Sequence, residues 1–232
     1  MEKKHSRRIR AEGIVSMMNL VINFHGIGDP PPGIEEGEAE VWTSVEEMNR
    51  ILDLAEGRPE VAITSDDGNV SDLEILLPAL LKRRLTATFF VLTGRIGKPG
   101  FLDEQGIGVL VESGMRIGLH GHAHVSWRGL DVDAARIEWF EARERLAAVS
   151  GQSIEDAACP FGRYDRGTIG GLRRAGISRI FTSDRGWFRS GAMPIPRNSV
   201  GTSTSSSVIE ELLERPRIPF IDSLRRTVKR WR

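Results

Sequence analysis

Residues 61–68 read Val-Ala-Ile-Thr-Ser-Asp-Asp-Gly, a short apolar run that ends in two adjacent carboxylates and a glycine. The run from Val61 to Thr64 has the length and the β-branched content of a short buried strand. Asp66, Asp67 and Gly68 then follow the C-terminal end of that strand. Polar residues in this position are typical of the active-site edge of a parallel barrel.

The segments on either side of this stretch alternate between strand-like and helix-like patterns. We expect strands at residues 20–24, 61–64, 86–92, 115–119, 157–159 and 179–182, and helices at residues 45–56, 72–82, 103–113, 131–149 and up to residue 175. This alternation favours parallel strands joined by crossover helices. A chain of 232 residues also lies within the range of one α/β barrel, so we expect a single-domain α/β fold of this type.

The composition is that of an ordinary globular chain. Hydrophobic residues make up 40% and charged residues 28%, and 32 Lys and Arg balance 32 Asp and Glu, which gives no indication of nucleic-acid binding. Cys159 is the single cysteine, so no internal disulfide can form. Residues 1–20 are basic but lack the apolar stretch of a signal peptide, and the apolar run around Pro78 is too short to span a bilayer. We therefore expect a cytoplasmic protein.

Polar residues follow the expected strands at several separate places. These places are His25, Asp66-Asp67, His120 to His124, Pro160 to Tyr164, and Asp184. In a parallel barrel the C-terminal ends of the strands meet at one rim, which carries the active site. We therefore expect these segments to converge on one site.

Three of the five histidines in the chain lie within residues 120–124, which read His-Gly-His-Ala-His. Two histidines four residues apart on a helical turn face the same way, so His120 and His124 could bind one metal ion. His122 would point elsewhere. The alternative is a surface or core histidine cluster with no ligand.

The adjacent carboxylates of Asp66 and Asp67 favour the same chemistry. Two close carboxylates push each other's pKa values apart unless a cation neutralises one of them. If Asp67 binds a metal, Asp66 stays free to act as a base on water activated by that metal. An Asp-Asp-Gly turn without function is the alternative.

Four motifs together resemble the NodB-type polysaccharide deacetylases of carbohydrate esterase family 4. Thr64 to Gly68 is similar to the family motif T-F-D-D-G, and His120 to His124 is similar to H-[ST]-x-x-H. Asn23 to Gly28 resembles the first strand of the family, and Cys159 to Asp165 resembles its P-[YF]-G loop. The motifs occur in the family order, and the resemblance covers about residues 19 to 200.

The resemblance implies a distorted (β/α) barrel of parallel strands. Asp67, His120 and His124 would bind one divalent ion, most often Zn²⁺, with Co²⁺, Ni²⁺ or Mn²⁺ as alternatives, and Asp66 would be the catalytic base. Activated water would attack the acetamide of an N-acetylated sugar or glycan, with a backbone N–H after the P-[YF]-G loop holding the oxyanion. Phe161 and Tyr164 would help to wall the sugar pocket. The expected substrate-contacting residues are Phe161, Gly162, Arg163, Tyr164, Asp184 and Arg197.

The sequence also departs from the family pattern. No histidine follows His124, so the late histidine that supplies the general acid is missing, and we propose His25 for that role with His122 as second choice. Ala158 stands where many members have an arginine that supports the catalytic base, Ser65 replaces an aromatic residue, and Gly121 replaces a Ser or Thr.

Two arginines and one aspartate are candidates to fill gaps in this pattern. Arg163 or Arg197 could support Asp66 or bind a substrate carboxylate or phosphate, because a guanidinium forks onto such groups. Surface arginines are the alternative. Asp184 could orient an arginine or a ligand histidine, or be an exposed turn residue.

The expected organisation is a polar segment at 1–18, the deacetylase-like barrel at 19–200, and a serine-rich loop followed by a basic C-terminal helix at 201–232. The basic residues of 221–232 could contact an anionic membrane surface, although packing on the barrel is the preferred interpretation.

We expect a metal-dependent hydrolase that removes an N-acetyl or related acyl group from a sugar in glycan metabolism. The first alternative is an amidase or imidase that cleaves a C–N bond of a small amide or cyclic imide on the same fold. The second is a catalytically silent sugar-binding domain.

Overall fold

A computed structural model describes residues 18–31, 34, 37–202, 204 and 206–214. Six parallel strands lie side by side in chain order: β1 (Met18–Phe24), β2 (Val61–Asp67), β3 (Ala87–Val91), β4 (Arg116–Leu119), β5 (Asp156–Ala158) and β6 (Arg179–Thr182). Short strands complete the circuit, because β8 (Ile195–Pro196) pairs with β6 and β9 (Asn198–Ser199) pairs with β1. The strand β7 (Phe188–Arg189) lies antiparallel to the start of β1. The fold is therefore the expected α/β barrel of parallel strands.

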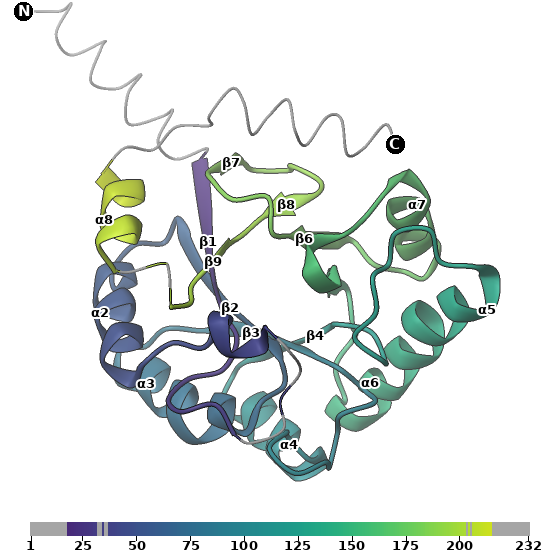
Figure 1. The fold of residues 1–232 in the computed structure, drawn as a ribbon, viewed down its shortest axis with the longest axis horizontal. Helices are drawn as coiled ribbons and strands as arrows, with labels where there is room; N and C mark the ends of the chain where they lie inside the picture. Colours follow the sequence, from purple (N-terminus) through teal and green to yellow (C-terminus); the bar gives the residue numbers. More distant parts are fainter. Residues whose placement is uncertain (1–17, 32–33, 35–36, 203, 205, 215–232) are drawn as a thin grey trace, which may run out of the picture.

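Helices surround the strands on the outside (Figure 1). They are α2 (Val45–Ala55), the π-helical η2 (Asp72–Leu76) with α3 (Leu77–Lys82), α4 (Glu104–Glu112), α5 (Val132–Ala135), the π-helical η3 (Arg136–Glu141), α6 (Ala142–Ser150), α7 (Arg166–Arg174) and α8 (Ser206–Glu214). Two 3₁₀ turns, η1 (Glu38–Val41) and η4 (Pro160–Gly162), lie in loops. Several helices begin at a polar residue whose side chain accepts a backbone N–H, as Ser44, Asp103, Asp131 and Asp165 do.

The expected strands and helices are present, with ends that differ by up to three residues. The strand β2 runs on to Asp67, so both carboxylates belong to the strand end itself. The helix α8 was not expected, and it begins inside the serine-rich stretch that we predicted as a loop. Its Ile209 and Leu213, four residues apart, are buried, and the helix contacts α2. The basic stretch at 221–232 lies outside the described residues, as does the predicted polar segment 1–18 except for Met18, which begins β1.

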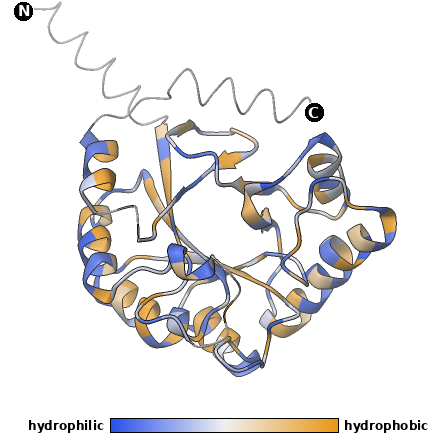
Figure 2. Cartoon of the chain, in the orientation of Figure 1, coloured by the Kyte–Doolittle hydropathy of each residue, from blue (hydrophilic) through white to orange (hydrophobic). Residues whose placement is uncertain are grey.

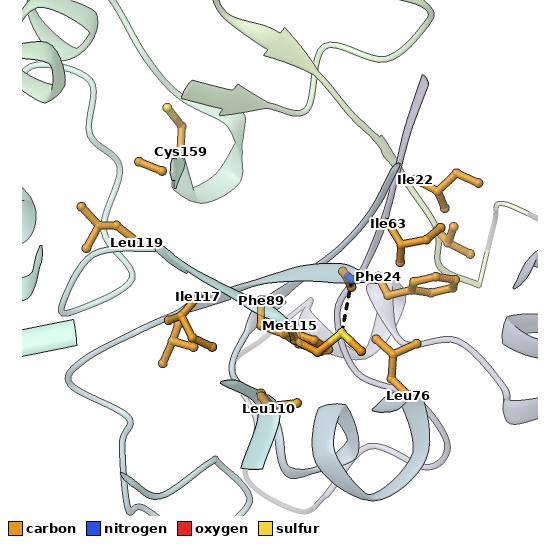
Figure 3. Close-up of a cluster of buried hydrophobic side chains, with 14 of the residues drawn as sticks. Ile22, Phe24, Ile63, Leu76, Phe89, Leu110, Met115, Ile117, Leu119 and Cys159 are labelled. Atoms are coloured by element: carbon orange, nitrogen blue, oxygen red, sulfur yellow. Dashed lines mark hydrogen bonds between the residues drawn. The ribbon is translucent and has the colours of Figure 1, made fainter. Parts of the chain in front are cut away.

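Two apolar clusters pack against the strands, one on the outer face and one on the inner face. On the outer face, Ile22, Ile63 and Phe89 pack against helix residues such as Leu76 and Leu110 (Figure 3). The helices carry hydrophobic and hydrophilic residues together (Figure 2), as expected for helices with one face on a core. This outer cluster fixes the helices around the strands.

The second cluster fills the barrel interior and consists of Val21, Phe90, Ala158, Phe181 and Ile195. Gly118 makes room for it, because a Cβ at this position would lie 2.5 Å from the Phe90 ring. Side chains alternate along a strand, so the next inward-facing residues lie two positions before or after this cluster. The interior cluster therefore separates the two ends of the barrel.

None of the helices in the described ranges has both the length and the apolar composition needed to cross a membrane.

Candidate metal centre and active site

A cavity of about 380 Å³ opens at the C-terminal ends of the strands. Its lining comes from segments far apart in the sequence: His25, Gly37, Glu38, Val41, Asp66, Asp67, His120, His124, Cys159, Phe161, Ser183 and Ser199. The structure thus brings together the polar ends of the first, second and fourth strands and the loop after the fifth. Burial raises the pKa of the Cys159 thiol, so this residue lines the cavity as a neutral group.

Asp67, His120 and His124 form a three-residue group, called the metal group below, whose candidate ligand atoms lie within 4.8 Å of one another. Oδ1 of Asp67 is 3.5 Å from Nε2 of His120 and 3.6 Å from Nε2 of His124. In a tetrahedral zinc site with bonds of about 2.0–2.1 Å, neighbouring ligand atoms lie about 3.3–3.5 Å apart. The two measured separations are close to that spacing.

The hydrogen bonding of these residues also fits a metal. Among the described residues, no hydrogen-bond partner reaches the buried Oδ1 of Asp67. A buried carboxylate oxygen without a partner is costly, and a cation would remove that cost. The donor set of one carboxylate and two imidazoles suits a divalent ion such as zinc, and it leaves a fourth position open.

His120 is prepared for metal binding by its surroundings. Its Nδ1 lies 2.9 Å from the carbonyl oxygen of Ala158, so Nδ1 carries the proton and Nε2 faces Asp67. Burial lowers the pKa of His120 to about 4, against the opposite influence of Asp66 and Asp67. The imidazole is therefore neutral near pH 7, as a metal ligand must be.

The histidine segment is not the helical turn that we predicted. Residues 120–124 form a loop in which Gly121 has φ 96° and His124 has φ 54°, both in the left-handed region. The carboxylate of Glu138 accepts hydrogen bonds from the backbone N–H groups of His122 and Ala123 at 2.8 and 2.9 Å. A Cβ at residue 121 would lie 2.2 Å from Oε2 of Glu138, so this loop requires the glycine that replaces the Ser or Thr of the family motif.

Asp66 lies beside the metal group and is bound by a different partner. Nη1 and Nη2 of Arg197 donate to its two carboxylate oxygens at 2.6 and 2.7 Å, and Nδ2 of Asn23 donates to Oδ2 at 3.2 Å. Burial opposes ionisation of Asp66, but Arg197 and, to a smaller extent, His120 outweigh it and hold its pKa well below the usual range. Asp66 is thus a carboxylate at neutral pH, held in a fixed orientation.

Arg197 takes the place of the arginine that is missing at Ala158. It lies between β8 and β9, where the chain passes from β6 to β1 and closes the barrel. Its side chain is fully buried and does not line the cavity. Of the two roles considered for Arg197, its burial and its bonds to Asp66 favour support of Asp66 over contact with substrate.

His25 lies on the cavity side of Asp66. Its Nε2 is 3.7 Å from Oδ2 of Asp66, and its side chain is 17% exposed. His122 instead has Nδ1 2.9 Å from the hydroxyl of Thr93, and it is not among the cavity-lining residues. Of the two histidines considered as an acid, His25 is the one next to Asp66.

A family model described as polysaccharide deacetylase matches residues 53–180, more than half of the chain. The chain belongs to the polysaccharide deacetylase family. A similar curated protein is "Putative polysaccharide deacetylase YxkH" of Bacillus subtilis (strain 168), which is 25% identical over 126 residues. That alignment covers 54% of this chain and 45% of the relative, so the chain spans less than half of the relative's length.

Solved structures of deacetylases share the fold. The Streptococcus pyogenes deacetylase PplD in complex with acetate has a TM-score of 0.73 and 19% identity, with 85% of this chain and 99% of that chain covered. IcaB from Ammonifex degensii has a TM-score of 0.70 and 23% identity, with 86% and 98% covered. These likenesses establish the NodB-type barrel for this member of the family.

The P-[YF]-G loop of this polysaccharide deacetylase family member contributes Cys159 and Phe161 to the cavity wall. Phe161 is 56% exposed, and its ring centroid lies 4.5 Å from that of His124. Gly162, with φ 60°, packs on Ser183, where a Cβ would come within 2.8 Å of the serine side chain. Arg163 is exposed, with its guanidinium 5.7 Å from the Phe161 ring.

Tyr164 was expected to help wall the sugar pocket, but it is not among the residues that line the cavity. It is buried in the outer apolar cluster, and its hydroxyl donates to Oδ2 of Asp184 at 2.8 Å. Asp184 also accepts from the hydroxyl of Thr182 at 2.9 Å. Asp184 thus accepts from two hydroxyls, and its bond with Tyr164 ties the P-[YF]-G loop to the end of β6.

The backbone N–H groups of Gly162 and Arg163 donate to the carbonyls of Cys159 and Pro160 within the turn. These two groups are therefore not available to an oxyanion. The N–H of Phe161 has no acceptor among the described residues, and this residue lines the cavity.

One cavity residue was not identified from the sequence. Oε1 of Glu38 lies 3.7 Å from Nδ1 of His124 and accepts from Nη2 of Arg95 at 2.7 Å. Its loop, residues 30–40, looks like an ordinary exposed segment, and no local signal separates Glu38 from the other glutamates there. The fold alone brings this carboxylate to the metal group.

Proposed function

We propose that this chain is a metal-dependent N-deacetylase that hydrolyses the acetamide of an N-acetylated sugar or glycan. The main support is the separation of roles between two adjacent aspartates. Oδ1 of Asp67 lies near both histidine Nε2 atoms, whereas Arg197 donates to both carboxylate oxygens of Asp66. A site that only binds a metal would not require a second, separately oriented carboxylate.

Asp67, His120 and His124 would hold the ion, with Zn²⁺ as the most suitable and Co²⁺, Ni²⁺ or Mn²⁺ as alternatives. When bound, such an ion supplies Lewis-acid activation of the attacking water and of the acetamide carbonyl. Family membership supports this assignment, because the motif residues match in type and order.

Asp66 would act as the general base. Oδ2 is its cavity-side oxygen, because it is the one that lies 3.7 Å from His25 and 4.0 Å from His120. The carboxylate is ionised at neutral pH, so it can accept the proton of the attacking water. Asn23 and Arg197 fix its orientation, which avoids reorganisation during the reaction.

His25 would donate a proton to the leaving nitrogen. Its ring lines the same cavity as the metal group, and its Nε2 is directed to Asp66. The N–H of Phe161 would be the backbone donor to the oxyanion, in place of the N–H groups that follow it. The exposed face of the Phe161 ring would contact the sugar.

The test is acetate release by purified protein reconstituted with Zn²⁺. The panel should contain N-acetylglucosamine oligomers, nucleotide-linked and lipid-linked N-acetyl sugars, and a cyclic imide for the alternative reaction. We expect acetate from at least one sugar and none after chelation. Ring opening of the imide without acetate release would favour the amidase or imidase alternative, and metal binding without turnover would favour a silent domain.

A further inference from the structure

The barrel has a second hollow at its opposite end, where the strands begin. Its volume is about 550 Å³, and Val61 to Ile63 line it from the first half of β2, whereas Asp66 and Asp67 line the active-site cavity from the second half. The interior cluster around Phe90 lies between these two ends. The hollow is therefore separate from the proposed catalytic site.

Four arginines line this hollow, and they come from four different parts of the chain. They are Arg58 before β2, Arg84 before β3, Arg116 at the start of β4 and Arg179 at the start of β6. The described lining contains no acidic residue. The whole chain has equal numbers of basic and acidic residues, so this concentration of cations is local.

Two of the arginines are held in place by a buried carboxylate. Asp156 is fully buried and accepts from Nε and Nη2 of Arg179, both at 2.5 Å, and its Oδ2 lies 3.4 Å from Nη2 of Arg116. Both arginine side chains nevertheless remain about half exposed, at 52% for Arg116 and 45% for Arg179. Asp156 thus holds two guanidinium groups that both line the hollow and remain accessible to solvent.

The other two arginines have no such partner. Within the described ranges, no carboxylate lies at ion-pair distance from Arg58 or Arg84, and both side chains are exposed. Four guanidinium groups around one buried carboxylate leave a local excess of positive charge. An anion in the hollow would lower the repulsion among them.

We propose that this hollow binds a phosphate-type anion. Guanidinium groups fork onto phosphate oxygens, and a phosphate group carries about −1.5 to −2 charges at pH 7 with three acceptor oxygens. A single carboxylate would leave most of the excess charge unbalanced, and a neutral sugar would not require four cations. The volume leaves room for a second phosphate or an attached group, since ligand pockets commonly measure about 300–1,000 Å³. The source of the phosphate is either a small soluble anion or a lipid headgroup.

The experiment is titration of the full chain with inorganic pyrophosphate by calorimetry, at constant ionic strength. The test variant is Arg58→Ala with Arg84→Gly, because residue 84 has φ 55° and glycine adopts that conformation without strain. The matched control is Arg173→Ala with Arg174→Ala, which removes two exposed arginines from the last turn of α7. Arg58→Ala alone serves as a second variant that leaves the backbone at 84 unchanged.

We expect saturable binding by the natural chain, a dissociation constant raised about tenfold or more in the test variant, and a change below about twofold in the control. Arg58→Ala alone should raise it by a smaller factor. Absence of saturable binding, equal binding by the test variant, or an equal loss in the control would overturn the proposal. Acetate release by the variants is a separate measurement, so failure here leaves the proposed function untouched.

A second arm distinguishes the two sources. Vesicles of phosphatidylcholine that contain phosphatidic acid are compared with pure phosphatidylcholine vesicles. If pyrophosphate binds, recruitment to phosphatidic acid that is lost in the test variant identifies a lipid-borne phosphate. Pyrophosphate binding without such recruitment identifies a soluble anion.

Discussion

Arg197 binds Asp66 through two parallel hydrogen bonds, although the two residues lie 131 positions apart in the sequence. Both side chains are buried, and Oδ1 of Asn23 accepts from Nη1 of Arg197 at 2.8 Å. The arginine reaches Asp66 because Ile195 to Ser199 closes the barrel between β6 and β1. Barrel closure and orientation of the proposed base therefore depend on the same short segment.

Arg197→Ala should lower the free energy of unfolding by about 3–5 kcal/mol, because it leaves a buried carboxylate without its cation. Arg197 holds the pKa of Asp66 below its unfolded value of about 3.9. The stabilisation is therefore present above pH 4 and is lost as the pH falls through the folded pKa. Denaturant unfolding from pH 7 downward should show the difference between the two proteins shrinking below about pH 4. Arg163→Ala, an exposed control, should stay within about 0.5 kcal/mol at pH 7.

Asp72→Asn should stabilise the chain at neutral pH. Burial, followed by the charges of Asp67 and Asp66, raises the pKa of Asp72, while the hydroxyl of Ser65 donates to its Oδ1 at 2.6 Å. The folded state keeps a proton that the unfolded chain releases above about pH 4, so stability falls as the pH rises from there toward the folded pKa. Asparagine at residue 72 keeps an oxygen that can accept from the hydroxyl of Ser65, and it has no group that titrates. With chelator present, the variant should have the higher melting temperature at pH 7, and the two melting temperatures should converge near pH 4. A difference in melting temperature that does not depend on pH would contradict the account.

His120→Ala and His124→Ala should each abolish retention of a metal ion and with it turnover. His122→Ala is the matched control, because this histidine belongs to the same loop but is exposed and lies near the hydroxyl of Thr93. Metal content by elemental analysis after dialysis should fall to background in the first two variants and remain near one ion per chain in the control. Equal retention in all three would exclude the proposed ligand set.

His25→Ala should lower kcat more than it raises KM on an acetamide, because protonation of the leaving amine is needed mainly in the transition state. An activated acetate ester, whose leaving group needs little protonation, should be hydrolysed at close to the original rate. Steady-state kinetics on both substrates checks this. Equal losses on the two would show that His25 binds substrate or shapes the cavity.

The six main strands and most helices could be predicted because they follow from local patterns. Short runs such as Leu20 to Phe24 and Thr86 to Leu92 are rich in β-branched and aromatic residues, which favours buried strands over helices. The exception is α8, whose first residues lie in a serine-rich stretch, and whose stability depends on Ile209 and Leu213 packing near α2. The spacing of Ile209 and Leu213 is a helical signal, but the serine-rich residues just before them favour a loop.

The three candidate metal ligands could be selected by motif, and the structure brings them together, but the shape of their loop could not be predicted. The loop has a left-handed residue at His124, and its neighbours His122 and Ala123 are bound by Glu138, which lies 16 and 15 residues away in sequence. The roles of Arg197 and Glu38 likewise depend on barrel closure and loop placement. Side chains that reach the site from distant segments resemble surface residues in the sequence alone.

The central claim is that Asp66 is a base beside the metal group and is not a ligand of the ion. The most direct measurement compares Asp66→Asn with the natural chain for zinc content and for acetate release from the best sugar substrate. We predict unchanged content of about one ion per chain with kcat lowered by about 10²–10⁴-fold, as loss of a general base often produces. Loss of zinc with the residual rate per bound ion unchanged would contradict the account.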